Sequence, residues 1–290
     1  MADLYIVAAG SGSRLKSNMP KALVPITDEP CLTTTLQQIA LKFRKTFVVT
    51  NVLVQDQWRK YFEHLLSAYP ELAEQTTALS IRSGLGDGHA TLQGILAAER
   101  MEGSSLSPDI VVAWGDVFIP NAEIIDELLT VTLMGSGVLP AVNENDPYVS
   151  LLVDENMRCI SADFSKHGER HSTGFHDQSV FRFDLPRLKT ALALLHNALW
   201  KGDRYFTPAG ELSLLYTFHL LYNSGDPAYV YQTKYPTRTF NTVEEVVAIQ
   251  REIGNCWQTK VAISQSGLDN LRGEKSRANG DAVAHPPLSL

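Results

Sequence analysis

The fold of this chain is decided by the stretch Ile6-Val7-Ala8-Ala9-Gly10-Ser11-Gly12-Ser13-Arg14-Leu15, followed by Pro20-Lys21-Ala22-Leu23. It begins as an apolar strand and continues into a turn of small residues that carries a single arginine. Gly10 and Gly12 can adopt positive φ and let the backbone approach a ligand closely. Consecutive N–H groups in such a turn point toward anionic oxygens, especially where a helix begins. The sequence therefore predicts a phosphate-binding turn, to which Arg14 and Lys21 add positive charge.

Two common phosphate-binding loops are excluded by Leu15. The dinucleotide fingerprint needs a third glycine at this position. The P-loop needs a glycine before its Lys-Ser/Thr pair, whereas this chain reads Leu15-Lys16-Ser17. A glycine-rich turn without a ligand is an alternative for the glycines alone, but it does not account for Arg14 and the Pro20-Lys21 pair at this spacing.

Composition indicates a globular α/β protein. The chain has 290 residues, of which 44% are hydrophobic and 20% are charged, and it is long enough to bury a large core. The net charge of −7 and the lack of a Lys/Arg run argue against nucleic acid as a partner. An acidic protein that handles phosphates must concentrate positive charge locally, which gives weight to Arg14 and Lys21.

Cysteine usage and the beginning of the sequence indicate a reducing compartment. Cys31, Cys159 and Cys256 are far apart and odd in number, so neither a disulfide framework nor a zinc site is predicted. The sequence enters a strand directly, and it has no basic segment followed by a long apolar run. We therefore expect a cytoplasmic protein with no membrane partner; the oligomeric state is not predicted.

The first half of the chain alternates apolar strands with amphipathic helices, which indicates a mainly parallel sheet covered on both faces. Strands are expected at residues 4–9, 46–52, 78–81 and 110–114, and helices at residues 32–43, 58–73 and 90–100. Such sheets bind ligands at the carboxyl ends of their strands. Gly10 and Asp116 each follow a strand, so both are expected at that edge.

The second half changes character. Short strands are expected at residues 137–142, 148–153, 158–164 and 179–184, with helices at 186–200, 211–223 and 243–253 and a late strand at 228–233. We interpret residues 143–185 as an antiparallel lid over the acceptor within a domain of residues 1–263. Residues 264–290 are polar and are expected to be a disordered tail.

Three further segments have candidate site chemistry. Residues 83–91 form a second glycine-rich turn before a helix, with Gly86, Asp87, Gly88 and His89; a simple helix start is the alternative. Asp116 follows a buried strand, and a carboxylate there suits Mg²⁺, which prefers oxygen ligands and bridges phosphates. Thr239-Phe240-Asn241-Thr242-Val243-Glu244-Glu245 begins the last helix, where Thr242 is also a good N-cap.

Together these segments resemble the sugar-phosphate nucleotidyltransferase family. The first stretch is similar to its pattern A-A-G-x-G-x-R-(L/M) followed by P-K-x-L, and Leu85-Gly86-Asp87-Gly88-His89-Ala90 resembles the loop of the N-acetylglucosamine-1-phosphate uridylyltransferase branch. The late segment resembles the family motif (I/V)-N-T-x-E-(D/E). The hexapeptide repeats that would build a β-helix domain are absent from this sequence.

The resemblance implies a Rossmann-like three-layer α/β/α fold with a mixed, mainly parallel sheet and a role for each matching residue. Ala8–Ser13 and Gly86–His89 would bind the nucleotide. Arg14 would neutralise the departing β- and γ-phosphates, and Lys21 would stabilise the α-phosphate. Asp116 and Asn241 would hold Mg²⁺.

Acceptor recognition departs from the family pattern. Tyr148-Val149 stands where the uridylyltransferase branch has Tyr-Gly, and Asp177-Gln178-Ser179 replaces Asn-x-Gly. Asp163 aligns with a sugar-binding glutamate, and Glu211 retains only the start of a Gly-Glu-Tyr-Tyr motif. Tyr148, Asp163 and Glu211 are nevertheless the predicted acceptor-binding residues. His167, His171 and His176 lack a regular metal-ligand spacing, so a metal site is not predicted there.

The predicted function is condensation of an NTP with a sugar 1-phosphate, giving a nucleotide-sugar and pyrophosphate. Two alternatives are open at this point. One is a cytidylyl- or guanylyltransferase that acts on a phospho-alcohol or a molybdopterin-type acceptor. The other is a nucleotide-binding regulator whose acceptor site has decayed, although Arg14, Lys21, Asp116 and Asn241 are all retained.

Overall fold

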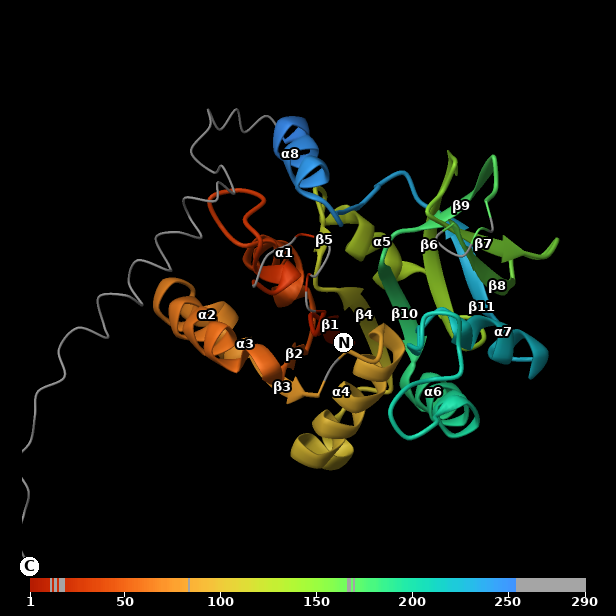
Figure 1. Cartoon of the computed structure of the whole chain (residues 1–290), viewed down its shortest axis with the longest axis horizontal. Coiled ribbons are helices and arrows are strands. Elements are labelled where there is room, and N and C mark those ends of the chain that lie inside the picture. Colours follow the sequence, from red (N-terminus) through yellow and green to blue (C-terminus); the bar gives the residue numbers. More distant parts are fainter. Residues whose placement is uncertain are drawn as a thin grey trace, which may run out of the picture.

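The protein is a three-layer α/β/α structure built on one mixed ten-stranded sheet (Figure 1). The computed structural model describes residues 1–10, 12, 15, 19–82, 84–165, 168 and 170–253. The strands of the main sheet run in the order β3-β2-β1-β4-β10-β6-β9-β7-β8, with β11 beside β6. The three-layer architecture predicted from the sequence is therefore confirmed.

The first half of the sheet is parallel. Its strands are β1 (Asp3–Val7), β2 (Lys45–Asn51), β3 (Thr76–Ile81) and β4 (Asp109–Trp114). β1 lies between β2 and β4, and Val7 is paired with both Val49 and Trp114. The carboxyl ends of these strands consequently lie at one edge of the sheet, as the strand–helix alternation predicts.

The second half of the sheet is largely antiparallel. Its strands are β6 (Gly137–Asn145), β7 (Val149–Val153), β8 (Cys159–Phe164), β9 (Thr173–Asp177), β10 (Val180–Asp184) and β11 (Ala228–Gln232). β10 pairs antiparallel with β4 on one side and β6 on the other. The antiparallel section predicted at residues 143–185 thus continues the main sheet. A separate ribbon joins β5 (Val117–Phe118) to β12 (Arg238–Thr239).

Side-chain alternation along the strands divides the core between two faces. Tyr5, Val7 and Val112 pack under α4 (Asp87–Glu102), α6 (Leu185–Leu199) and α7 (Tyr216–Asn223). Leu4, Ile6 and Val111 face the other helices. These are α1 (Cys31–Ile39), α2 (Gln55–Ala68), α3 (Pro70–Gln75) and α5 (Glu123–Thr130). A third cluster packs α8 (Val243–Glu252) against Leu15, Val24 and Ile26.

Four elements differ from the sequence expectations. The predicted helix at 58–73 is two helices, because Pro70 disfavours a helical conformation at Tyr69 and itself begins α3. The predicted helix at 211–223 begins only at Tyr216, so residues 211–215 are irregular. The sequence pattern did not predict α5 or β9.

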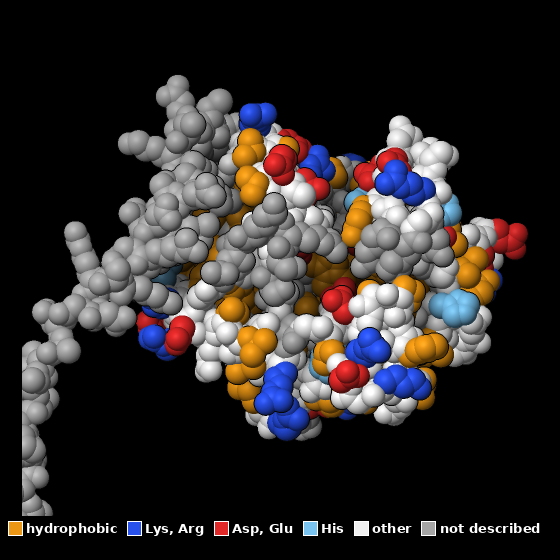
Figure 2. Space-filling view, in the orientation of Figure 1, with side chains coloured by type: hydrophobic (Ala, Val, Ile, Leu, Met, Phe, Trp, Pro, Cys, Tyr) orange, Lys and Arg blue, Asp and Glu red, His pale blue; other side chains and the backbone are white. Residues whose placement is uncertain are grey.

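The surface offers a mixture of charges. On the face seen in Figure 2, acidic and basic side chains are interspersed rather than gathered by sign. Among the described residues, no helix combines the length and the apolar character needed to cross a lipid bilayer.

Arg182 of β10 ties the two halves of the sheet to α5. Its Nε lies 2.9 Å from Asp109 Oδ1, and its Nη2 lies 2.7 Å from Asp109 Oδ2. Its Nη1 donates to three carbonyls at the end of α5, those of Leu128, Leu129 and Val131, at 2.8–3.1 Å. The side chain is only 13% exposed, so the carbonyls and the carboxylate depend on this single cation.

We predict that Arg182→Met lowers the free energy of unfolding by about 3 kcal/mol, because it leaves a half-buried carboxylate and several carbonyls without a donor. Arg59→Met is the matched control. Arg59 pairs with Glu63 on an exposed helix face, and its loss is expected to cost less than about 1 kcal/mol. Urea unfolding of both variants measures the difference; equal losses would contradict the role of Arg182.

Candidate active site

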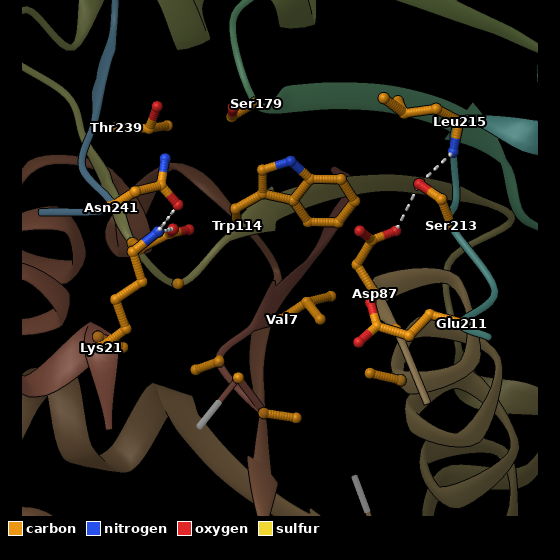
Figure 3. Close-up of a pocket in the computed structure, with 18 of the residues that line it drawn as sticks. Val7, Lys21, Asp87, Trp114, Ser179, Glu211, Ser213, Leu215, Thr239 and Asn241 are labelled. Carbon is orange, nitrogen blue, oxygen red and sulfur yellow. Dashed lines mark hydrogen bonds and ion pairs between the residues drawn. The ribbon is translucent and has the colours of Figure 1, made fainter. Parts of the chain in front are cut away.

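A cavity of about 360 Å³ opens at the carboxyl ends of β1 and β4. Its walls come from the first glycine-rich turn, the start of α4, the end of β4, the antiparallel strands β7–β9, residues 211–215 and the segment after β12. Figure 3 shows Lys21 and Asn241 on one side of the cavity and Asp87, Glu211 and Ser213 on the other. Trp114 lies between the two groups.

Three predicted residues that are distant in sequence meet on the first side. Lys21 Nζ forms an ion pair with the Asp116 carboxylate and donates a hydrogen bond to Asn241 Oδ1 at 3.1 Å. Lys21 Nζ also lies 5.4 Å from the centroid of the Phe240 ring, close enough for a cation–π contact. The Lys21 and Asp116 side chains are 17% and 22% exposed, so they are largely shielded yet accessible from the cavity.

Local structure holds each of the three in place. Lys21 begins the short helix η2 (Lys21–Leu23). The preceding residue is Pro20, whose ring fixes its own φ at −53°. Asp116 follows β4 after one residue, Gly115. Asn241 precedes α8, whose start is secured by a capping box between Thr242 and Glu245. The N-cap interpretation of Thr242 and the site interpretation of Asn241 are therefore compatible.

Gly115 allows the strand ends to approach each other. A Cβ at this position would lie 2.6 Å from Ala8 Cβ and 3.2 Å from Ala22 Cβ. The Gly115 N–H also donates to the Val7 carbonyl at 2.8 Å. This contact between small residues brings Asp116, the first turn and the Lys21 segment together, because a larger residue would separate their backbones.

The first turn lines the cavity through Ala8, Ala9, Gly10 and Gly12. Gly12 adopts a φ of +66°, and a Cβ there would lie 3.0 Å from the Met19 carbonyl oxygen, so the turn requires glycine. A Cβ at Gly10 would meet nothing within 4 Å, which leaves room beside the backbone. Ser11, Ser13 and Arg14 lie outside the described residues.

The second turn has a packing role that sequence reasoning missed. A Cβ at Gly86 would lie 2.3 Å from the Leu212 carbonyl oxygen, and one at Gly88 would lie 2.7 Å from the Leu214 nitrogen. Asp87 Oδ1 accepts hydrogen bonds from the Leu214 N–H at 2.6 Å and from Ser213 Oγ at 3.1 Å. These contacts hold residues 212–214 against the start of α4. Gly86 and Asp87 line the cavity, whereas Gly88 does not.

His89 lies away from the cavity, although it was predicted to contact the nucleotide. Its side chain is buried, and its Nδ1 lies 2.7 Å from Tyr205 Oη. His196 Nδ1 lies 2.7 Å from the same oxygen, and the Trp200 ring packs beside both imidazoles. A hydroxyl with one proton bridges two imidazoles, so it donates to one and accepts from the other. Burial, followed by the charge of His196, lowers the pKa of His89.

The three predicted acceptor residues are not together. Tyr148 and Glu211 line the cavity. Asp163 does not line it; its carboxylate pairs with His171 Nε2 at 2.8 Å. His176 pairs with Glu144 instead, so these histidines serve separate carboxylates. Within the described part of the chain, no cluster of His, Cys, Asp and Glu could hold a metal ion by itself.

Asp177 is a cavity residue that the sequence analysis noted but did not select. It ends β9, is 5% exposed, and accepts hydrogen bonds from Ser179 N at 2.8 Å and Ser179 Oγ at 3.4 Å. Burial raises the pKa of this carboxyl. The one sequence signal for it is that Asp177-Gln178-Ser179 stands where the resembling family has Asn-x-Gly.

Comparison with known proteins places these features in a family. A profile of the MobA-like NTP transferase domain matches residues 4–195. The bifunctional protein GlmU of Jannaschia sp. (strain CCS1) is 26% identical over 214 residues, which cover 72% of this chain and 44% of that protein. That of Ruegeria sp. (strain TM1040) is 30% identical over 145 residues, covering 50% and 29%. The chain thus spans less than half the length of these relatives.

Solved structures share the fold. HddC from Yersinia pseudotuberculosis, complexed with GMP-PN, superposes with a TM-score of 0.59 at 17% identity, covering 87% of this chain and 99% of that one. A putative glucose-1-phosphate thymidylyltransferase from Bacillus anthracis, in complex with a sucrose, has a TM-score of 0.64 at 13% identity, covering 87% and 95%. At these identities the likeness is one of fold alone.

We predict that His89 makes stability depend on pH. Because its pKa is lowered from 6.5 in the folded protein, the unfolded chain binds the proton more readily. The contribution of neutral His89 is therefore fully present above pH 6.5 and is lost as the pH falls from there through the lower pKa of the folded state.

Urea unfolding of His89→Asn between about pH 8 and pH 5 measures this effect. Asn can keep a polar atom near Tyr205 Oη but does not titrate, so the variant should lose less stability on acidification than the wild type. His219→Asn, at an exposed position of α7, is the control and should retain the wild-type pH profile. An unchanged profile in His89→Asn would refute the assignment.

Proposed function

Because the chain belongs to the family of the MobA-like NTP transferase domain, we propose that it transfers a nucleotidyl group from an NTP to a phosphorylated small molecule. The resemblance inferred from the sequence is confirmed at the level of this family. The observation that carries the proposal is the convergence of Lys21, Asp116 and Asn241 beside the first glycine-rich turn.

The proposed reaction is an in-line substitution at phosphorus. A phosphate oxygen of the acceptor forms a bond to the α-phosphorus of the NTP. The bond from the α-phosphorus to the oxygen that bridges it to the β-phosphorus breaks, and pyrophosphate leaves with the electron pair. The attacking phosphate is already an anion, so no side chain has to remove a proton. Catalysis then rests on alignment and on electrostatic stabilisation.

The predicted site residues have distinct parts in this proposal. The backbone of Ala8–Gly10 and Gly12 binds the triphosphate, with Arg14 as the predicted cation for the departing phosphates. Lys21 stabilises the α-phosphate, where negative charge accumulates as the bonds change. Trp114 lies between Lys21 and the pair Asp87 and Glu211 (Figure 3). This arrangement supports a cavity with a phosphate-binding end at Lys21 and an opposite end at Asp87 and Glu211.

The residues at the phosphate end also fit Mg²⁺. The Asp116 carboxylate and the Asn241 amide oxygen both reach Lys21 Nζ, so two hard oxygen donors lie at one point. Mg²⁺ is commonly held by one or two carboxylates together with substrate phosphates and water, which agrees with this short donor set. When bound there, the ion would hold phosphate oxygens together and offset their charge.

The sequence motifs favour a sugar 1-phosphate as the acceptor, which would place the enzyme in nucleotide-sugar synthesis. Phospho-alcohols and molybdopterin-type compounds are the other acceptors to be tested, because the antiparallel strands depart from the sugar-binding pattern. A cytoplasmic location is in keeping with such substrates and stays part of the proposal.

The test of the function is a pyrophosphate-release screen. Each of ATP, GTP, CTP, UTP and dTTP is combined with Mg²⁺ and with sugar 1-phosphates, phospho-alcohols or a molybdopterin-type compound. We expect release that depends on one NTP and one class of acceptor. The absence of release with every pair would overturn the proposal and favour a nucleotide-binding regulator.

We predict that Lys21→Ala lowers kcat by about 10²–10³, because one charge that stabilises the transition state is lost. The Lys21 side chain faces the cavity and is not part of the hydrophobic core, so circular dichroism should show an intact fold. Lys42→Ala is the control, since Lys42 pairs with Asp126 and does not line the cavity. Wild-type turnover by Lys21→Ala would rule out this mechanism.

A further inference from the structure

We propose that the acceptor carries an ammonium group a few atoms from its phosphate and that Asp177 binds this group. The inference rests on the nucleotidyl transfer proposed above and narrows the class of acceptor. Amino sugar 1-phosphates and phosphorylated amino alcohols share this chemistry. The evidence comes from the residues that line the cavity other than Lys21, Asp116 and Asn241.

Asp177 lies in a row of residues that crosses the antiparallel strands. Leu151 of β7 is opposite Phe175 of β9, and this antiparallel register places Val149 opposite Asp177. Val149 is in turn paired with Phe164 of β8. Asp177, Val149 and Phe164 all line the cavity. Asp177 therefore shares this row with two apolar side chains, while His176 and Ser179 beside it also line the cavity.

Charge is distributed unevenly around the cavity. Among the described residues that line it, the carboxylates are Asp87, Asp116, Asp177 and Glu211, whereas Lys21 is the one Lys or Arg. Lys21 is already paired with Asp116 at the phosphate end. Of the described side chains, His176 is the nearest in sequence to Asp177 that can carry positive charge, and its Nδ1 lies 2.5 Å from Glu144.

Asp177 is in an environment that penalises its charge. The hydrogen bonds it accepts come from the uncharged Ser179 N–H and hydroxyl groups, and burial raises its pKa. The charge of His176 and the hydrogen bonds from Ser179 act against this shift, but burial outweighs them. A buried carboxylate is costly, and a bound ammonium group would offset that cost. Formation of the turn to Ser179 does not require the charge, because Asn accepts the same hydrogen bond.

The apolar neighbours oppose a neutral sugar in this position. Val149, Phe164 and Leu215 line the cavity and offer no side-chain hydrogen bond to sugar hydroxyls. Trp114 and Tyr148 line it as well, and aromatic faces attract cations, quaternary ammonium groups included. A buried carboxylate with aromatic and apolar surroundings is therefore better suited to an ammonium group than to a ring of hydroxyls.

Isothermal titration calorimetry with matched pairs of phosphate compounds tests the proposal. Phosphocholine is compared with 3,3-dimethylbutyl phosphate, in which carbon replaces the charged nitrogen. Phosphoethanolamine is compared with propyl phosphate, and glucosamine 1-phosphate with glucose 1-phosphate. The wild-type protein should bind the charged member of at least one pair about 10- to 100-fold more tightly, the range expected for a charge-assisted contact. The pair that shows this preference tells whether the acceptor is an amino sugar 1-phosphate or a phosphorylated amino alcohol.

Asp177→Asn is the decisive variant, since it keeps the turn to Ser179 and removes the charge. It should bind both members of the responding pair about equally and should be at least as stable as the wild type at neutral pH. Asp146→Asn is the control, because it makes the same change in net charge at an exposed residue that does not line the cavity. It should keep the wild-type preference.

Two outcomes would overturn the proposal: no preference for the charged member in any pair, or a preference that persists in Asp177→Asn. Calorimetry does not depend on turnover. A failure of the proposed nucleotidyl transfer is therefore detected separately, as the absence of pyrophosphate release. Release of pyrophosphate with neutral acceptors alone would support the proposed transfer reaction but contradict the proposal that the acceptor carries an ammonium group.

Discussion

The backbone hydrogen bonds between β1 and β4 run in parallel register from Asp3 opposite Ile110 to Val7 opposite Trp114. They end both strands at the same level of the sheet, so the first turn and Asp116 start from neighbouring points. The contact of Gly115 with Ala8 and Ala22 then closes the remaining space. Lys21 can reach Asp116 because of this close approach, and Asn241 completes the group from the far end of the chain.

The sequence predicted this part of the site because its residues follow rules that act locally. A small-residue turn after an apolar strand, and an acid after another, must lie at the carboxyl edge of a parallel sheet. Asn241 is different, since no spacing relates it to Asp116 and only the family resemblance brought the two together. Helix and strand types were largely correct for the same local reason, whereas Pro70 divided a pattern that periodicity alone reads as continuous.

The rest of the site depended on contacts that sequence spacing does not encode. Gly88 and Asp87 look like ligand-binding residues, and both also pack against residues 212–214, about 125 positions later, although Asp87 lines the cavity as well. His89 turns toward Tyr205 for the same reason: its partner belongs to a distant segment. Asp163 and Asp177 are both acids in the antiparallel strands, and only strand register and burial distinguish the one that faces the cavity.

The insertion of β10 between β4 and β6 has a mechanical consequence. Because the backbone of β10 pairs on both sides, the parallel and antiparallel halves form one continuous sheet. A rotation of one half relative to the other would break this strand pairing. The distance from the end of β4, beside which Lys21 pairs with Asp116, to Asp177 is consequently set by strand pairing and not by a hinge. With the roles proposed above, a fixed distance of this kind would select an acceptor by the separation between its phosphate and its ammonium group, as well as by the signs of the two charges.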